Sequence, residues 1–461
     1  MAGIVFVVWP LISSINSSLK LARDLRSGGH RVHYLGLVDC EEPVREHGFD
    51  FIPVFETWFP KDFTERREQR LQSLNGWQRF LEIRRFTRQD QAFLDALVEG
   101  KERQLDDIVA QLWPNLMILV LSDDAMIIPA LLAHSAGIKA VYLCDTLGRG
   151  ENSAVPPVTT GIIPTRDWFG KIKIRLAWKK LFLVRNCQAL VAAWLGLAVS
   201  WHRAMRLLAR RYHCPWELVE QTDEFPLQFK LPELVLFPRP FEFPDADQSD
   251  RQYIEASIDL KRQQAPFSWD RLDAGCPLIY CALGTVDWLS KEKYRNFFQT
   301  VIDVAALRMD FQWVIALGEA FDPADFNSIP AKVTIINRAP QLDLLNRAAI
   351  MISHGGAATV KECIYFGVPM VLFPLGFDHP GYAARVRYHG LGVTGDIHRL
   401  NVRTLNHLID TVAGDPRYRA QVQQMQCKFR EAENSRPGLR IIETMIGGST
   451  PIRERAANSA R

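Results

Sequence analysis

The segment best suited to chemistry in this sequence spans residues 350–362 and reads Ile-Met-Ile-Ser-His-Gly-Gly-Ala-Ala-Thr-Val-Lys-Glu. An apolar run typical of a buried strand meets the pair Gly355–Gly356, and a helical pattern begins directly afterwards. Glycines let the backbone approach an anion closely, and the first turn of a helix offers unpaired N–H groups at a positive dipole end. His354 and the Thr359 hydroxyl add side-chain donors, and the Glu362 carboxylate suits ribose hydroxyls. The segment therefore predicts a pyrophosphate site that requires no metal ion if these donors stabilise the charge.

The same residues also allow an interpretation without any ligand. Thr359 and Glu362 have the spacing of a helix capping box, and a glycine pair before a helix can be only a tight turn. On this segment alone both interpretations stay open.

Other motifs accompany this segment in a fixed order. Asn337-Arg-Ala-Pro-Gln341 precedes it, and Gly367-Val-Pro369 and Phe377-Asp-His-Pro-Gly-Tyr-Ala-Ala-Arg385 follow it. Together they closely resemble the donor-binding signature of the UDP-glycosyltransferase superfamily, which includes the bacterial macrolide and carotenoid glycosyltransferases. Leu283-Gly-Thr285, at the end of an expected strand, resembles the other phosphate-facing turn of that family.

The resemblance implies a GT-B fold, transfer of a sugar from a nucleotide donor with inversion at the anomeric carbon, and roles for the matching residues. Arg338 and Gln341 would contact the base and ribose. The sugar hydroxyls would be read by Asp378 and by His379, which stands where glutamine is commonest in the family and so leaves the sugar open. The full set of expected donor-site residues is Gly284, Thr285, Arg338, Ala339, Gln341, His354, Gly356, Ala358, Thr359, Glu362, Asp378 and His379.

The chain departs from the family near its N-terminus. Members usually carry a Gly-His pair after the first strand, and that histidine acts as base on the acceptor hydroxyl; here Ser14 falls on its position. A serine hydroxyl is not a general base near neutral pH. Three explanations stay open: an acceptor acidic enough to arrive ionised, direct action by Asp123 or Asp124, or loss of transferase activity in a protein that binds a nucleotide sugar as an auxiliary subunit. For the two aspartates, which follow an expected strand at 116–121, a helix N-cap is the alternative role.

The elements that must position these residues alternate between strand-like and helical patterns, which is typical of parallel sheets with crossover helices. A chain of 461 residues exceeds what one core serves, so two doubly wound, Rossmann-like domains facing a cleft are expected, with a last helix crossing back to the first domain. No GxGxxG turn follows the first strand, which argues against a nicotinamide dehydrogenase. The expected division is an acceptor domain over 1–243, a linker over 244–265, a donor domain over 266–430, a returning helix over 431–446 and a disordered tail over 447–461. The expected strands are 4–9, 32–37, 116–121 and 140–143 in the first series, and 278–282, 311–316, 333–336, 350–353 and 371–373 in the second.

The charge and the apolar stretches of the sequence limit the classes of partner that the chain can bind. The formal net charge of +3 gives no overall case for nucleic acid. The longest apolar stretch, 189–199, is too short to span a bilayer, and a cytoplasmic location is expected. The insertion at 165–215 is basic and rich in tryptophan, which suits either peripheral contact with a membrane or a lipophilic acceptor, or simple packing on the first domain.

These observations together predict an inverting, metal-independent glycosyltransferase with no separate cofactor. Its donor is a UDP- or dTDP-sugar, and its acceptor is a lipophilic or aromatic small molecule of the natural-product type, which the basic insertion also allows to be anionic. The alternative is a catalytically impaired nucleotide-sugar-binding protein of a biosynthetic pathway.

Overall fold

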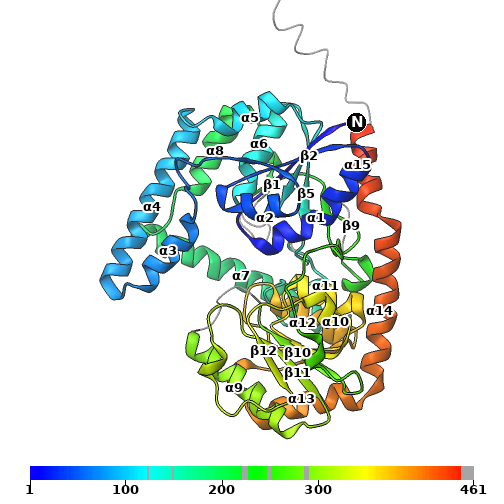
Figure 1. The fold of residues 1–461 in the computed structure, drawn as a ribbon. Coiled ribbons are helices and arrows are strands. Elements are labelled where there is room, and N and C mark those ends of the chain that lie inside the picture. The colour runs from blue at the N-terminus through cyan, green and yellow to red at the C-terminus, as the bar shows by residue number, and fades with distance from the viewer. Residues whose placement is uncertain (122–123, 148–149, 221–226, 247–250, 285–289, 448–461) are drawn as a thin grey trace, which may run out of the picture.

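The computed structural model describes residues 1–121, 124–147, 150–220, 227–246, 251–284 and 290–447. Two parallel sheets, each covered by helices, form the two halves of the molecule (Figure 1). The expected pair of doubly wound domains is thereby confirmed.

The first sheet has seven parallel strands in the order β3-β2-β1-β4-β5-β8-β9. Its strands are β1 Gly3–Val8, β2 Arg31–Gly36, β3 Asp50–Pro53, β4 Leu116–Val120, β5 Lys139–Cys144, β8 Glu233–Val235 and β9 Arg251–Tyr253. The helices of this half are α1 Ile12–Ser27, α2 Glu41–Glu46, α3 Phe63–Gln72, α4 Gly76–Glu99, α5 Gln104–Leu112, α6 Ile127–Ser135, α7 Trp168–Leu195 and α8 Trp201–Arg211. A short antiparallel pair, β6 Val219–Glu220 and β7 Gln228–Phe229, follows α8.

The second sheet has six parallel strands in the order β12-β11-β10-β13-β14-β15. Its strands are β10 Leu278–Ala282, β11 Gln312–Ala316, β12 Val333–Ile336, β13 Ala348–Ser353, β14 Met370–Leu372 and β15 Gly392–Thr394. The helices are α9 Lys291–Leu307, α10 Gln341–Leu345, α11 Ala357–Phe366, α12 His379–Tyr388, α13 Val402–Gly414, α14 Pro416–Ser435 and α15 Pro437–Gly447. Short 3-10 turns include η2 Asp124–Met126 and η7 Ile397–Arg399.

The central strands are apolar along their whole length because helices cover both faces of each sheet. Every residue of β4, Leu-Met-Ile-Leu-Val, is buried, and so is every residue of β10, Leu-Ile-Tyr-Cys-Ala. Strands buried on both faces lose the alternation of polar and apolar residues. This is why short continuous apolar runs were sufficient to predict them.

Each sheet has one point where the strand order reverses. In the first sheet it lies between β1 and β4, and in the second between β10 and β13. In open α/β sheets, ligands bind outside the carboxyl ends of the strands at such a point. The fold therefore predicts that ligands bind at the loops after these four strands.

The C-terminal helices join the two halves. α14 packs on α11 of the second half, and α15 packs on α1 of the first, with Ile442 buried in the core beneath the first sheet. Figure 1 shows α14 running along one side of the second half and α15 reaching the first. The predicted return is thus confirmed, but it consists of two helices, because Arg436 adopts a left-handed backbone conformation with φ 47° that ends α14. The predicted linker, 244–265, contains β9, which extends the first sheet.

Candidate functional site

The loop after β13 lies at the strand-order reversal of the second sheet. β13 ends at Ser353, and α11 begins at Ala357. Gly355 turns the chain with φ +85°, a conformation that favours glycine. Gly356 is the N-cap of α11 and carries no side chain to cap it, so the N–H groups of the first turn lack partners within the helix. Thr359 lies inside that first turn and not at the N-cap, so the capping box that its spacing with Glu362 allowed does not form.

The imidazole of His354 is enclosed by two glycines from different loops. A Cβ atom added to Gly356 would lie 2.6 Å from Nε2 of His354, and one added to Gly284 would lie 2.6 Å from its Cε1. Gly284 follows β10 and has φ +80°. The structure thus brings together Gly284, His354 and Gly356, and both glycines leave room for the ring. Thr285 lies outside the described residues.

A second imidazole completes this cluster. The ring centroids of His354 and His379 are 4.5 Å apart in an edge-to-face arrangement. Burial lowers the pKa of His354 to about 3, with a further contribution from His379, and burial lowers the pKa of His379 to about 4. Both rings are therefore neutral near pH 7 and can offer hydrogen bonds but no positive charge. Asp378 is the N-cap of α12, and its Oδ1 lies 3.9 Å from Nε2 of His379.

The Glu362 carboxylate lies farther along α11 and is buried in a small polar network. Gln341 Nε2 donates to Glu362 Oε2 at 2.5 Å, and Arg262 Nη1 lies 3.0 Å from Glu362 Oε1. Tyr280 Oη donates to Gln341 Oε1 at 3.4 Å. The two residues expected at the ribose, Gln341 and Glu362, are therefore in direct contact.

Arg262 is a residue of this network that sequence reasoning missed. It lies 100 positions before Glu362, inside the stretch expected to be a linker, where no motif marks it. Its neighbour Gln264 is also drawn in, because Gln264 Oε1 accepts from the backbone N–H of Leu342 in α10. The segment that joins the halves thus contacts the expected ribose end of the donor site.

We expect Arg262→Met to weaken nucleoside diphosphate binding by about tenfold, since loss of one charge-assisted hydrogen bond costs about 1.5–3 kcal/mol and Glu362 loses one of its two partners among the described residues. Calorimetric titration with UDP and dTDP measures this. Arg271→Met, nine residues farther along the chain and outside the network, is the control and should bind as the parent chain does. Equal affinities for the Arg262 and Arg271 variants would contradict the positioning role.

The remaining expected donor-site residues are Arg338, Ala339 and Ala358. Arg338 follows β12, its side chain is 82% exposed, and it pairs with Glu319 at 2.9 Å. Ala339 and Ala358 are partly buried, the first against the hydrophobic core and the second in the first turn of α11. Arg338 is thus available to a base at the surface, but no contact fixes it to the Gln341–Glu362 network within the described residues.

The expected catalytic residues lie at the strand-order reversal of the first sheet. Ser14 is in the first turn of α1, after β1, and η2 begins at Asp124, after β4. Ser14 is only 1% exposed, and among the described residues its Oγ has no hydrogen-bond partner, whereas the neighbouring Ser13 is exposed. Asp123 and the side chain of Asp124 lie outside the described residues. The topology therefore brings these loops to one sheet edge, but Ser14 points into the protein.

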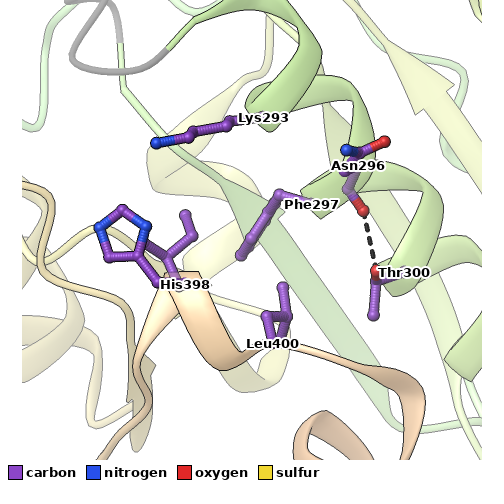
Figure 2. A pocket seen from close by; sticks show the side chains of 7 residues that line it. Lys293, Asn296, Phe297, Thr300, His398 and Leu400 are labelled. Atoms are coloured by element: carbon purple, nitrogen blue, oxygen red, sulfur yellow. Dashed lines mark hydrogen bonds between the residues drawn. The ribbon is translucent and has the colours of Figure 1, made fainter.

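A surface cavity of about 240 Å³ lies between α9 and the segment at η7 (Figure 2). Its walls come from α9 and η7, with Lys293, Phe297 and His398 among the lining side chains. It contains none of the expected donor-site residues.

Comparisons with known proteins agree with the fold. Residues 299–438 match the family described as erythromycin biosynthesis protein CIII-like, C-terminal domain. NDP-glycosyltransferase YjiC of Bacillus subtilis is 24% identical over 443 residues, which cover 95% of each chain. Among solved structures, the calicheamicin glycosyltransferase CalG4 has a TM-score of 0.65 at 19% identity, with 97% of this chain and 98% of that one covered. The glycosyltransferase VinC, solved in complex with dTDP, has a TM-score of 0.61 at 16% identity, with 96% and 98% covered.

The residues that match the CIII-like family include α11, which carries Glu362, and α12, which carries His379. The relatives and the solved structures extend the likeness over nearly the whole chain and both sheets. The chain has the GT-B fold of these solved glycosyltransferases, and residues 299–438 are similar to the CIII-like family.

Proposed function

We propose that this chain is an inverting glycosyltransferase that moves a sugar from a UDP- or dTDP-sugar to a lipophilic or aromatic small molecule of the natural-product type, without a metal ion in the transfer step. The observation that carries the proposal is the uncapped N-terminus of α11, beside the enclosed ring of His354, at a strand-order reversal. That arrangement suits a diphosphate. Complex formation between VinC and dTDP supports including dTDP among the donors.

In the proposed step, an acceptor oxygen attacks the anomeric carbon while the bond from that carbon to the diphosphate oxygen breaks. The electron pair of the broken bond leaves with the nucleoside diphosphate, and the configuration inverts. The first-turn N–H groups of α11 and a neutral His354 would donate hydrogen bonds to the leaving oxygens, where negative charge develops. Such fixed donors stabilise the transition state more than the ground state, which is the requirement for catalysis.

This chain differs from the UDP-glycosyltransferases that it resembles in how the acceptor oxygen would lose its proton. The Ser14 hydroxyl is buried and cannot serve as a base. Our proposal is therefore that the acceptor oxygen arrives already ionised, as in a carboxylate, a phosphate or an acidic phenol, or loses its proton to Asp123 or Asp124. The same feature favours the second candidate, an auxiliary protein that binds a nucleotide sugar without transferring it.

The proposal is tested by calorimetric titration of the chain with UDP, dTDP, GDP, NAD and ATP in the presence of EDTA. Selective binding of UDP or dTDP is expected, and His354→Ala and Thr359→Ala should each weaken it. Binding of none, or of NAD or ATP with no effect of either substitution, would overturn the donor site. Donor hydrolysis or transfer by the isolated chain would then separate the enzyme from the auxiliary protein.

A further inference from the structure

Helix α7 is held to the rest of the protein along one narrow face. Of its 28 residues only Gly170, Ile174 and Trp178 are buried. Ile174 and Trp178 lie four positions apart and so share a face of the helix. Trp178 anchors that face, because its Nε1 donates to the carbonyl oxygen of Val155 at 2.9 Å. Figure 1 shows α7 extending from the neighbourhood of α4 and α8 towards α11 and α12.

The opposite face of α7 is apolar and exposed. Phe169, Leu176, Leu183 and Leu190 follow one another at intervals of seven residues, and each is between 59% and 72% exposed. At 3.6 residues per turn they form one row, directed away from Ile174 and Trp178. Their neighbours widen the row towards the C-terminal end, where Trp194 is 86% exposed. We name this surface the α7 stripe and define it as Phe169, Leu176, Leu183, Val184, Cys187, Leu190, Val191 and Trp194.

From Trp168 to Trp216, the segment that carries the α7 stripe has charges of one sign only. The sequence contains no acidic residue from Trp168 to Trp216. Five exposed cations lie on the N-terminal half of α7, and Lys173 and Lys180 are on the stripe side of the helix. The cations of the whole stretch are Lys171, Lys173, Arg175, Lys179, Lys180, Arg185, Arg203, Arg206, Arg210 and Arg211.

We propose that the α7 stripe docks on a membrane surface that contains anionic lipids. An amphipathic helix with an apolar row and flanking lysines inserts its apolar side chains at the level of the headgroups, where the cations meet lipid phosphates. Among the described residues, no helix has the length and apolar character needed to cross a bilayer, so contact would be confined to one surface. Docking of the α7 stripe on a membrane does not depend on which donor or acceptor the protein uses.

The same charges argue against a second copy of this chain as the occupant. Two α7 stripes packed in parallel would bring the lysines of one copy close to those of the other, with no acidic residue of the segment to pair with them. Like charges that face each other across an interface are unfavourable. An anionic lipid surface complements the cations on the N-terminal half of α7.

The experiment is sedimentation of the full chain with vesicles of phosphatidylcholine alone or with added phosphatidylglycerol. We expect binding to the phosphatidylglycerol vesicles only, weakened by salt. The double variants Leu190→Glu/Trp194→Glu and Lys179→Glu/Lys180→Glu should each lower the partition coefficient by about tenfold or more. Leu307→Glu is the matched control, because Leu307 is also exposed, at 67%, but ends α9 in the other half. It should partition as the parent chain does.

Circular dichroism and UDP or dTDP titration on the same variants separate lost folding from lost docking. These titrations also keep the two proposals apart, since a chain that binds no nucleotide can still bind vesicles. Absence of binding to phosphatidylglycerol vesicles, or equal binding by all variants, would overturn the membrane proposal. Sedimentation velocity that reveals a dimer broken by Leu190→Glu/Trp194→Glu would also overturn it, in favour of a second copy.

Discussion

Gly356→Ala is expected to weaken binding of UDP or dTDP by about 10- to 100-fold, because it displaces the ring of His354 from its proposed hydrogen bond to the diphosphate, and a charge-assisted hydrogen bond is worth about 1.5–3 kcal/mol. The backbone at Gly356 has φ −64°, which alanine adopts without strain. The new methyl carbon, however, would lie 2.6 Å from Nε2 of His354, so the ring must move. Its other side is already limited by Gly284. Titration calorimetry of the variant measures the loss directly.

Gly414→Ala is the control for Gly356→Ala. Gly414 is the last residue of α13, and a Cβ added there meets no atom within 4 Å. This variant should bind nucleotide as the parent chain does, and both variants should unfold near the parent temperature. Nucleotide affinity that is the same in the Gly356 and Gly414 variants would show that the ring of His354 does not define the site.

Arg385→Met is expected to destabilise the protein by about 3–5 kcal/mol, because it removes one partner of a buried ion pair and leaves the other charge uncompensated. Arg385 Nε donates to Glu242 Oε1 at 2.8 Å, and both side chains are 1% exposed. Arg385 belongs to α12, whereas Glu242 lies between β8 and β9 of the first sheet. The pair therefore holds the two halves together, and urea denaturation should report the loss.

Two further variants test whether the cost comes from the unpaired charge. Arg385→Met/Glu242→Gln should recover part of the stability lost by Arg385→Met, since no buried charge is left alone. Arg399→Met removes an exposed arginine that lies 3.6 Å from Asp396 and should change stability little. A double variant that is no more stable than Arg385→Met would contradict this account.

The ion pair between Arg385 and Glu242 also changes the interpretation of the motif from Phe377 to Arg385. Sequence reasoning took Phe377 to Arg385 as one signature and assigned Asp378 and His379 to the sugar. In the structure, the later residues of this motif contact the first half: Tyr382 Oη donates to the carbonyl oxygen of Asp145 at 2.6 Å, and Arg385 pairs with Glu242. One short motif thus carries His379, which is expected at the donor site and lies against His354, and also residues that contact the first half.

The elements around the site could be predicted because their signals are local. Strands such as β4 and β10 are buried on both faces and appear in the sequence as short apolar runs. The turn at Gly355 and Gly356 was visible because a left-handed conformation and close packing both favour glycine. The break at Arg436 was missed, because a non-glycine residue with positive φ has no reliable local signal.

The sequence by itself determined the two alternating series of strands and helices, the glycine turn before α11 and the absence of a histidine at position 14, since each depends on neighbours within a few residues. Only the tertiary structure decided that Gly284 encloses His354, that Arg262 holds Glu362, and that Ser14 is buried. These contacts join loops from different strands, or residues about 100 positions apart. They depend on how the sheets and helices pack, and residue periodicity carries no information about that packing.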